Sequence, residues 1–418
     1  MILISSMTTT VLSGVVVFLI IILFLVSILL LAKEKLSPKG DVKININDEQ
    51  ELTVSPGSSL LSTLSSQNIY LPSACGGGGT CGMCRCRVLE GGGTILPTET
   101  GFFTRKEQAD HWRLGCQVKV RESMKILLPQ SILGIKKWEC EVVSNKNVAT
   151  FIKEFVVKLP EGEGLDFAPG GYIQIDVPKY ETKFSDFDID DQFKGDWDKF
   201  NMWNLSVKND EETYRAYSMA NYPAEKNIVK LNIRIATPPF DKKKGGFMNV
   251  SPGICSSYIF SRKPGDKISI SGPYGEFHIK ETDNEMVYIG GGAGMAPLRS
   301  HIFHLFKTLK TNRKVSYWYG ARSSREVFYE EEFRAIEREF PNFSFHLALS
   351  EPLPEDNWTG YKGFIHQMLY DEYLSKHNAP EDIEYYFCGP PLMGSAVLNL
   401  LDSLGVPKDN ILYDDFGG

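Results

Sequence analysis

The sequence predicts a multidomain protein with a single N-terminal transmembrane helix, a small α+β unit, an antiparallel β-barrel and an α/β unit built on a parallel sheet. Three observations predict this fold class. An uncharged apolar run fills residues 11–32. Short apolar strands broken by Gly and Pro recur over residues 136–283, and strand-like and helix-like stretches alternate from residue 286 onward. A chain of 418 residues is also too long for one ordinary core.

Composition narrows the classes of function. The formal net charge of −7 argues against nucleic-acid binding, which usually needs a basic surface, so we expect no nucleic-acid partner. Eight cysteines are too few for a disulfide scaffold in a chain of this length.

The apolar run "VLSGVVVFLIIILFLVSILLLA" predicts a membrane anchor. As a helix it would span ~33 Å, about the thickness of the hydrocarbon core of a bilayer. A cleaved signal peptide is the alternative, but that needs a basic leading segment, a shorter run and a small-residue cleavage site, none of which is present. Lys33, Lys35 and Lys39 follow the run, so we expect the rest of the chain to be cytoplasmic.

Changes in pattern along the chain predict the domain boundaries. The expected segments are a tail at 1–10, the transmembrane helix at 11–32, a linker at 33–40, the α+β unit at 41–130, the barrel at 131–285 and the parallel-sheet unit at 286–418. At about residues 179–212 the barrel pattern is interrupted by aspartates mixed with phenylalanines and tryptophans. This insertion is either a docking surface or a surface excursion packed on its own aromatic side chains.

A cysteine-rich loop, "PSACGGGGTCGMCRC", carries the strongest chemical signal. The spacing Cys75-x5-Cys81-x2-Cys84, with Cys116 on a later predicted strand, is the ligand pattern of a [2Fe–2S] cluster. The glycines let the loop wrap closely around an inorganic core. A structural zinc site is the alternative, but zinc ligands usually come as two separated pairs. Cys86 also lies nearby, and we expect it to be a packing residue.

The motif "RAYSMA" and a later glycine turn predict a flavin site. Arg215 offers a fork of donors for a pyrophosphate, Tyr217 a flat ring for the isoalloxazine, and Ser218 a hydroxyl near flavin N5. "GICSSY" reads as a turn that opens a short helix and suits a second phosphate contact. The cofactor-binding candidates in this turn are Gly253, Cys255, Ser256 and Ser257.

"VYIGGGAGMAPLRS" is a glycine-rich turn between a predicted strand and helix, as dinucleotide sites require. It departs from the usual fingerprint because Pro297 stands where the third glycine falls. At the end of the next strand, "ARSSRE" supplies Arg322 instead of an acid, a chemistry that would also suit a 2′-phosphate. Cys388 in "FCGPPLM" ends a later strand, where it can sit beside a nicotinamide or simply pack in a core. The remaining candidates of this site are Gly290, Gly292 and Gly294.

Together these motifs resemble the ferredoxin–NADP reductase superfamily with an N-terminal ferredoxin domain. With the apolar run in front, the chain resembles, over essentially its whole length, the F subunits of bacterial sodium-translocating NADH:quinone oxidoreductases. The resemblance implies a β-grasp fold for the 2Fe-2S unit, an FAD-binding barrel and an NAD-binding α/β unit. It also implies catalytic roles for Ser218 and Cys388, and a cofactor contact by Phe416 in the terminal "YDDFGG".

The family implies that NADH gives a hydride to non-covalent FAD. Single electrons then pass to the [2Fe–2S] cluster and through partner membrane subunits to ubiquinone, while sodium is exported across the bacterial inner membrane. One alternative is the soluble NADH-dependent reductase component of a multicomponent oxygenase, which lacks the apolar run. Another is a membrane-tethered binding protein with a structural metal and no turnover, which leaves the nucleotide-type motifs unexplained.

Overall fold

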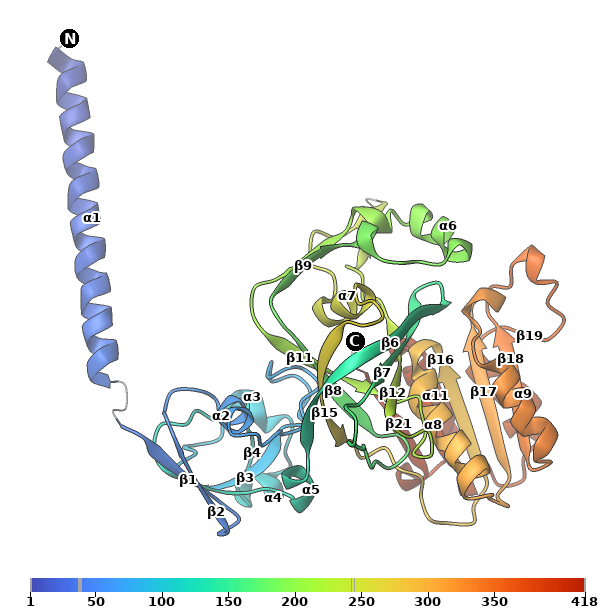
Figure 1. The fold of residues 1–418 in the computed structure, drawn as a ribbon. Helices are drawn as coiled ribbons and strands as arrows, with labels where there is room; N and C mark the ends of the chain where they lie inside the picture. Colours follow the sequence, from blue (N-terminus) through green and yellow to red (C-terminus); the bar gives the residue numbers. More distant parts are fainter. Residues whose placement is uncertain (1, 37–39, 242, 244, 417–418) are drawn as a thin grey trace. The chain divides into compact units, whose positions relative to one another are not determined.

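The structure is a computed structural model that describes residues 2–36, 40–241, 243 and 245–416 (Figure 1). Its contacts divide the chain into two compact units. The first comprises Met1–Leu71 and Gly82–Leu133, and the second comprises Pro72–Cys81 and Gly134–Gly418.

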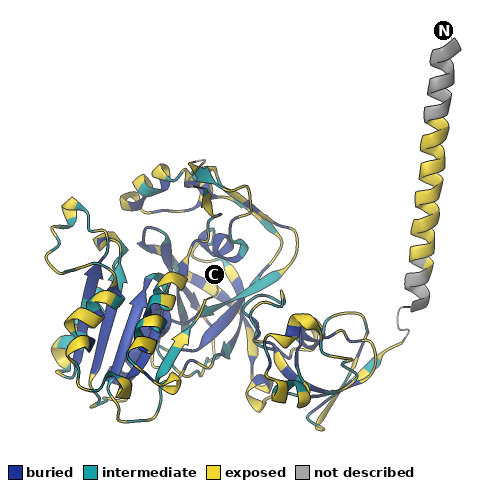
Figure 2. Ribbon diagram, turned by 180° about the vertical axis from the view of Figure 1, so that it is seen from behind, coloured by how far each residue is buried: buried dark blue, intermediate teal, exposed yellow. Residues whose placement is uncertain are grey.

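The N-terminal helix α1 runs over Ile2–Leu36 and contains the predicted anchor. Its window Leu12–Leu29 has a mean hydropathy of 3.2, and none of that window is buried in the protein. In Figure 2 the ribbon over this window has the colour of exposed residues. By length and composition, α1 is the one helix of the described chain that could cross a membrane.

The rest of the first unit is a five-stranded mixed sheet in the order β2-β1-β5-β3-β4 with short helices around it. Strands β1 and β2 form an antiparallel hairpin, and Ser59 caps α2 by accepting a hydrogen bond of 3.1 Å from the Ser62 N–H. The expected strand over "LGCQVKV" is wrong, because β4 ends at Leu114 and Cys116 lies in the turn beyond it. The elements are β1 (Val42–Ile46), β2 (Gln50–Val54), α2 (Leu60–Ser66), β3 (Arg85–Glu90), α3 (Pro97–Thr100), α4 (Arg105–Ala109), β4 (Trp112–Leu114), β5 (Met124–Leu127) and α5 (Gln130–Leu133).

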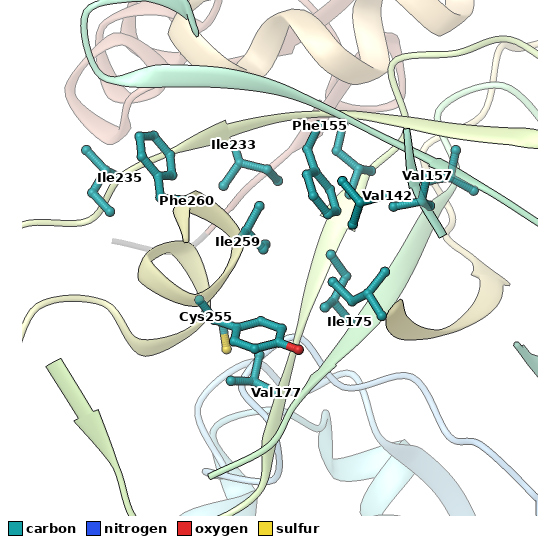
Figure 3. Packing of buried hydrophobic residues seen from close by; sticks show 14 of the residues in the cluster. Val142, Phe155, Val157, Ile175, Val177, Ile233, Ile235, Cys255, Ile259 and Phe260 are labelled. Atoms are coloured by element: carbon teal, nitrogen blue, oxygen red, sulfur yellow. The ribbon is translucent and has the colours of Figure 1, made fainter. Parts of the chain in front are cut away.

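The second unit begins with a six-stranded antiparallel sheet in the order β11-β8-β15-β6-β7-β12. An isolated bridge between Met219, just past β11, and Leu231 of β12 brings the two edge strands together, while no full ladder closes the barrel within the described residues. Figure 3 shows side chains of α7 packing with those of the strands to form the core. The elements are β6 (Lys136–Ala149), β7 (Ile152–Lys158), β8 (Tyr172–Val177), β11 (Thr213–Ser218), β12 (Ile228–Arg234), β13 (Phe240–Asp241), β14 (Gly246–Phe247), α7 (Ile254–Phe260) and β15 (Lys267–Tyr274).

The acidic aromatic insertion forms β9 (Tyr180–Lys183), α6 (Asp191–Lys199) and β10 (Ser206–Asn209). Its buried aromatic side chains join the core of the antiparallel sheet instead of packing only on one another. Trp197 Nε1 donates to the Thr150 carbonyl at 2.9 Å, and the buried Lys153 ammonium donates to the Asp188 carbonyl at 2.6 Å. The insertion is therefore fastened to the β6–β7 hairpin, with most of its aspartates facing solvent.

A six-stranded parallel sheet in the order β19-β18-β17-β16-β20-β21 completes the second unit, as the alternating pattern predicts. All residues of β16 are buried because helices cover both faces. Tyr288 packs with α8 and α9 on one face, and Ile289 packs with α10 and α11 on the other. The elements are β16 (Met286–Gly291), α8 (Met295–Phe303), β17 (Val315–Ala321), α9 (Glu330–Glu339), β18 (Phe343–Leu349), β19 (Tyr361–Lys362), α10 (Ile365–Glu372), β20 (Glu384–Cys388), α11 (Pro391–Ser403) and β21 (Ile411–Asp414).

Arg299 of α8 holds the antiparallel sheet and the parallel sheet together. Its buried guanidinium donates to the Ala220 carbonyl at 2.8 Å and to Glu225 at 2.9 Å, both beyond strand β11. The other side of the fork donates to Glu332 of α9 at 2.7 Å. The Arg299 guanidinium also lies 4.1 Å from the ring centroid of Phe303. One charged group of α8 thus satisfies acceptors from two other segments of the chain, the stretch after β11 and α9.

Replacing Arg299 with Met should lower the free energy of unfolding by about 3 kcal/mol, because the change leaves two acidic partners without their buried cation. Thermal unfolding of the full-length protein in detergent measures the loss. Arg338→Met, at a position that is 68% exposed and weakly paired, is the matched control and should change little. Equal unfolding temperatures for the two variants would contradict the clamping role of Arg299.

Candidate functional site

The predicted flavin strand is β11, which carries Arg215, Tyr217 and Ser218. Arg215 Nη1 donates to Thr213 Oγ1 at 3.1 Å and to the Tyr214 carbonyl at 2.8 Å. These bonds fix the guanidinium, while its Nε and Nη2 donors have no partner among the described residues. A fixed guanidinium with unused donors fits the pyrophosphate contact that the sequence motif predicts for Arg215.

Ser218 joins the end of β11 to the C-terminal strand. Its hydroxyl donates to Asp414 Oδ2 at 2.6 Å, and Asp414 lies beside Cys388 in the β20–β21 ladder. Burial raises the pKa of Asp414 to about 6; the bond from Ser218 lowers it and the charge of Asp415 raises it further. Burial also raises the pKa of Cys388, so this buried thiol stays neutral. The predicted catalytic pair, Ser218 and Cys388, therefore meets around Asp414.

The turn at the start of α7 combines close backbone packing with two hydroxyls. A Cβ on Gly253 would lie 2.6 Å from the Ala236 Cβ, so only glycine fits without movement. Ser256 Oγ donates to the Gly253 carbonyl at 3.2 Å, whereas the fully buried Ser257 Oγ has no partner in the described chain. Cys255 differs from the expectation for a ligand-facing group, because its side chain packs in the core of the sheet (Figure 3).

The glycine-rich turn lies between β16 and α8, as predicted. Gly292 has a φ of +56°, which favours glycine. A Cβ on Gly294 would lie 2.1 Å from the Cys388 carbonyl oxygen, so this glycine lets α8 begin directly against β20. Gly294 thus allows the close contact between helix and strand that the third glycine of the usual fingerprint provides. Pro297, which stands in place of that glycine, lies inside the first turn of α8. A Cβ on Gly290 would lie 2.6 Å from the Tyr317 hydroxyl.

A cavity of about 520 Å³ opens at the carboxyl ends of β16 and β17, where α/β sheets bind their ligands. Phe151 and Arg234, at one edge of the antiparallel sheet, line its other side, with the exposed Phe364. Among the described residues, no hydrogen bond or ion pair engages the Arg234 guanidinium, which suits an anionic ligand. Burial and then the like charge of Arg322 lower the pKa of Arg234.

The four predicted cluster ligands form two pairs. The Cys75 and Cys81 sulfurs lie 3.3 Å apart in one unit, and in the other the Cys116 N–H points to Cys84 Sγ at 3.5 Å. Two thiolates on one tetrahedral metal would be ~3.8 Å apart, so the first pair would have to open slightly to share an iron. Hydrogen bonding from Cys81 lowers the pKa of Cys75, which favours a thiolate. Over the described chain no group of three potential metal ligands is assembled, and the four-thiol assignment stays a prediction.

The position of Cys116 depends on a buried ion pair. Arg113 Nη2 donates to Glu99 Oε2 at 2.8 Å, and the Leu114 N–H donates to Glu99 Oε1 at 2.9 Å. Burial alone would raise the pKa of Glu99, but these hydrogen bonds keep it below its ordinary value. The end of β4, two residues before Cys116, is therefore fixed. Cys86 is fully buried, and burial raises its pKa to about 12, as expected for a packing residue.

Three family models match the chain in the order that the fold shows. The 2Fe-2S iron-sulfur cluster binding domain matches residues 44–121, the oxidoreductase FAD-binding domain residues 199–279, and the oxidoreductase NAD-binding domain residues 288–398. The chain is also 56% identical over 393 residues to the F subunit of the Na(+)-translocating NADH-quinone reductase of Pseudomonas aeruginosa, covering 94% of this chain and 95% of that protein. The chain belongs to this family of F subunits.

A second relative confirms the assignment. The corresponding F subunit of Klebsiella pneumoniae subsp. pneumoniae is 57% identical over 410 residues, which cover 98% of this chain and all of that protein. The predicted cofactor classes, a 2Fe-2S cluster, FAD and NAD(H), are confirmed by the three domains. The predicted enzyme class, an NADH-dependent oxidoreductase, follows from the family.

Solved structures share the fold at low sequence identity. The ferredoxin reductase in carbazole 1,9a-dioxygenase has a TM-score of 0.57 at 22% identity, covering 90% of this chain and 98% of its own. The FAD/NAD binding domain of a nitric oxide dioxygenase from Vibrio cholerae has a TM-score of 0.50 at 21% identity, covering 67% and 99%. Such identities show the fold alone, so the oxygenase-reductase alternative has less support than membership of the F-type subunits.

Three residues at this site were not predicted from the sequence, because none of them belongs to a recognisable local motif. Asp414 stands in the quoted "YDDFGG" and Arg234 is the last residue of β12, and neither has a recognisable sequence spacing to its neighbours in space. Glu326 lies four residues after Arg322, and this i,i+4 spacing was the only available signal. Phe416, predicted from the resemblance, lies two residues beyond the end of β21 and is half-exposed.

Asp414→Asn should become increasingly stabilising, relative to wild type, as the pH rises. The ordinary aspartate pKa is ~3.9, and the folded chain raises it to about 6. Stability from the proton on Asp414 is therefore present below the unfolded pKa and lost as the pH rises through the folded pKa. The measurement is the difference in unfolding temperature between variant and wild type from acid to mildly alkaline pH. Asp402→Asn, at an exposed position, should show no such trend; a constant difference for Asp414→Asn would refute the assignment.

Proposed function

We propose that the chain is the NADH-oxidising, electron-entry subunit of a membrane NADH:quinone oxidoreductase that exports sodium. Its other partners are the remaining membrane subunits of that complex. Electrons enter from NADH, pass through FAD to a [2Fe–2S] cluster and leave through partner subunits to ubiquinone. The proposal keeps the predicted segments: 1–10, 11–32, 33–40, 41–130, 131–285 and 286–418.

The observation that carries this proposal is the hydrogen bond between Ser218 and Asp414. It joins the strand of the flavin motif to the last strand of the nucleotide-binding sheet. Hydride transfer needs the two reacting rings in contact, so the elements that hold them must meet at one point. Cys388 lies at that point through its pairing with Asp414.

Each side chain has a positioning task in this proposal. Arg215 would hold the flavin pyrophosphate through its unused donors, with Gly253, Ser256 and Ser257 at a second phosphate contact and Tyr217 against the ring. Bound FAD would supply the exchange between a two-electron hydride and single electrons.

At the junction of the two sheets, Ser218 would present its hydroxyl beside flavin N5 while Asp414 fixes its orientation. The turn of Gly290, Gly292 and Gly294 would receive the NADH pyrophosphate, with Arg234 opposite. Cys388 would fill the space beside the nicotinamide with a small neutral group.

The cluster ligands in this proposal are Cys75, Cys81, Cys84 and Cys116. Their arrangement as two pairs supports two irons with two thiolates each. When bound, the cluster would accept one electron at a time.

The membrane anchor in this proposal is α1. The exposed apolar window Leu12–Leu29 supports insertion into a bilayer. The basic residues Lys33, Lys35 and Lys39 follow the window, so the redox units would lie on the cytoplasmic side of a bacterial inner membrane. Lys39 lies outside the described residues.

The cluster assignment is tested by single cysteine replacements. Replacing Cys75, Cys81, Cys84 or Cys116 with Ala should abolish the EPR signal of the NADH-reduced cluster, while reduction of the flavin by NADH, followed by its absorbance, survives. The matched control is Cys86→Ala, which removes a thiol from the same loop region and should leave the signal intact. Loss of the signal in the Cys86 variant together with its survival in a Cys116 variant would overturn the ligand set.

The anchor is tested by removing residues 1–35. The remaining protein should be soluble, keep both cofactors and oxidise NADH with ferricyanide, because every redox motif follows Lys33. It should fail to restore quinone reduction to membranes that lack the native chain, since the tether supplies a high effective concentration at the partner surface. Full restoration by the truncated protein would show that α1 does not couple the chain to its partners.

A further inference from the structure

The loop after β17 carries the residues that made a 2′-phosphate site plausible from sequence. Arg322 and Arg325 flank two serines at the position where dinucleotide-binding sheets meet the adenosine ribose. Arginines here usually accommodate the 2′-phosphate of NADPH, whereas a carboxylate binds the ribose hydroxyls of NADH. Whether these donors can bind a phosphate depends on the partners that they already have.

Carboxylates occupy the donors of this loop. Arg325 Nη2 donates to Glu355 at 3.2 Å, and its Nη1 lies 3.6 Å from Asp196 of the insertion. The Ser324 N–H donates to Asp356 Oδ2 at 3.2 Å, and the Ser324 hydroxyl donates to the other oxygen of the same carboxylate. The Ser324 donors and both terminal nitrogens of Arg325 are therefore already paired with carboxylates.

Arg322 forms an ion pair within its own loop. Its Nη2 donates to Glu326 Oε1 at 3.2 Å, and both residues line the 520 Å³ cavity. The Glu326 side chain is only 15% exposed, so its charge is poorly screened by solvent. The negative charge of Glu326 acts to raise the pKa of Arg234 and the pKa of Tyr319, which line the same cavity. Arg234 keeps its open donors, but the pyrophosphate that they suit is common to NADH and NADPH.

We propose that Glu326 makes this site select NADH over NADPH, by pairing with Arg322 and by placing a carboxylate where a 2′-phosphate would enter. Asp356 and Glu355 reinforce the selection by holding Ser324 and Arg325. The inference rests on the proposed function of the cavity as the NADH site. A nucleotide without the phosphate meets an acceptor for its ribose hydroxyls, and a nucleotide with it meets a buried like charge.

The test compares kcat/KM for NADH and NADPH in the full-length holoenzyme with ferricyanide as acceptor. Glu326→Gln should raise the NADPH-to-NADH ratio by about tenfold or more, because it removes the repulsive charge and releases Arg322. Competitive inhibition by adenosine 2′,5′-bisphosphate, relative to adenosine 5′-monophosphate, should strengthen by a similar factor without depending on hydride transfer. Glu326→Gln combined with Arg322→Gln should lose the gain.

The matched control is Glu372→Gln, which breaks an i,i+4 pair with Lys376 on the same domain and should leave both ratios unchanged. Unchanged ratios in Glu326→Gln would overturn the selection by Glu326, provided that the variant still oxidises NADH and retains FAD. Should Glu326→Gln fail to fold, Asp356→Asn must raise the inhibition ratio on its own, and an unchanged ratio would equally overturn the proposal. Wild-type protein that does not oxidise NADH would instead contradict the proposed function.

Discussion

The buried guanidinium of Arg299 is the constraint on which the geometry of the second unit depends. It binds the Ala220 carbonyl and Glu225 on the side of the antiparallel sheet, and Glu332 on the side of the parallel sheet. An isolated buried charge would be costly, so the cation is stable only where all these acceptors converge. A network of this kind fixes the relative placement of its members more narrowly than apolar packing, which tolerates small displacements.

That fixed placement explains why the ends of distant strands meet at one site. Ala220 lies two residues after the end of β11, so holding its carbonyl also helps to hold Ser218 at the position from which it reaches Asp414. Gly294 allows α8, which carries Arg299, to begin against the end of β20. The hydrogen bonds of Arg299 and the close packing at Gly294 therefore both act on the beginning of α8. Together they place the flavin strand beside the nucleotide-binding edge of the parallel sheet.

Local motifs made most of the fold and part of the site predictable from sequence. The glycine turn before α8 and the cysteine spacing each depend on residues close together in the chain, so they are visible without a structure. The strand expected around Cys116 was wrong because the Glu99–Arg113 pair ends β4 early, through contacts 14 residues apart. Asp414 was missed because its partner Ser218 is 196 residues away. A single sequence does not show which residues far apart in the chain contact one another.

Two arginines show how partners decide the chemistry of a residue type. Arg215 and Arg322 both follow sequence patterns typical of phosphate binding, and both are partly exposed. Arg215 is held by a hydroxyl and a carbonyl, which are neutral, so its positive charge remains for an anion. Arg322 is held by a carboxylate, so its charge is already paired with a negative one before any ligand arrives. A basic motif therefore predicts a phosphate site only where its acceptors carry no charge of their own, and this distinction separates the proposed FAD contact from the apparent 2′-phosphate site.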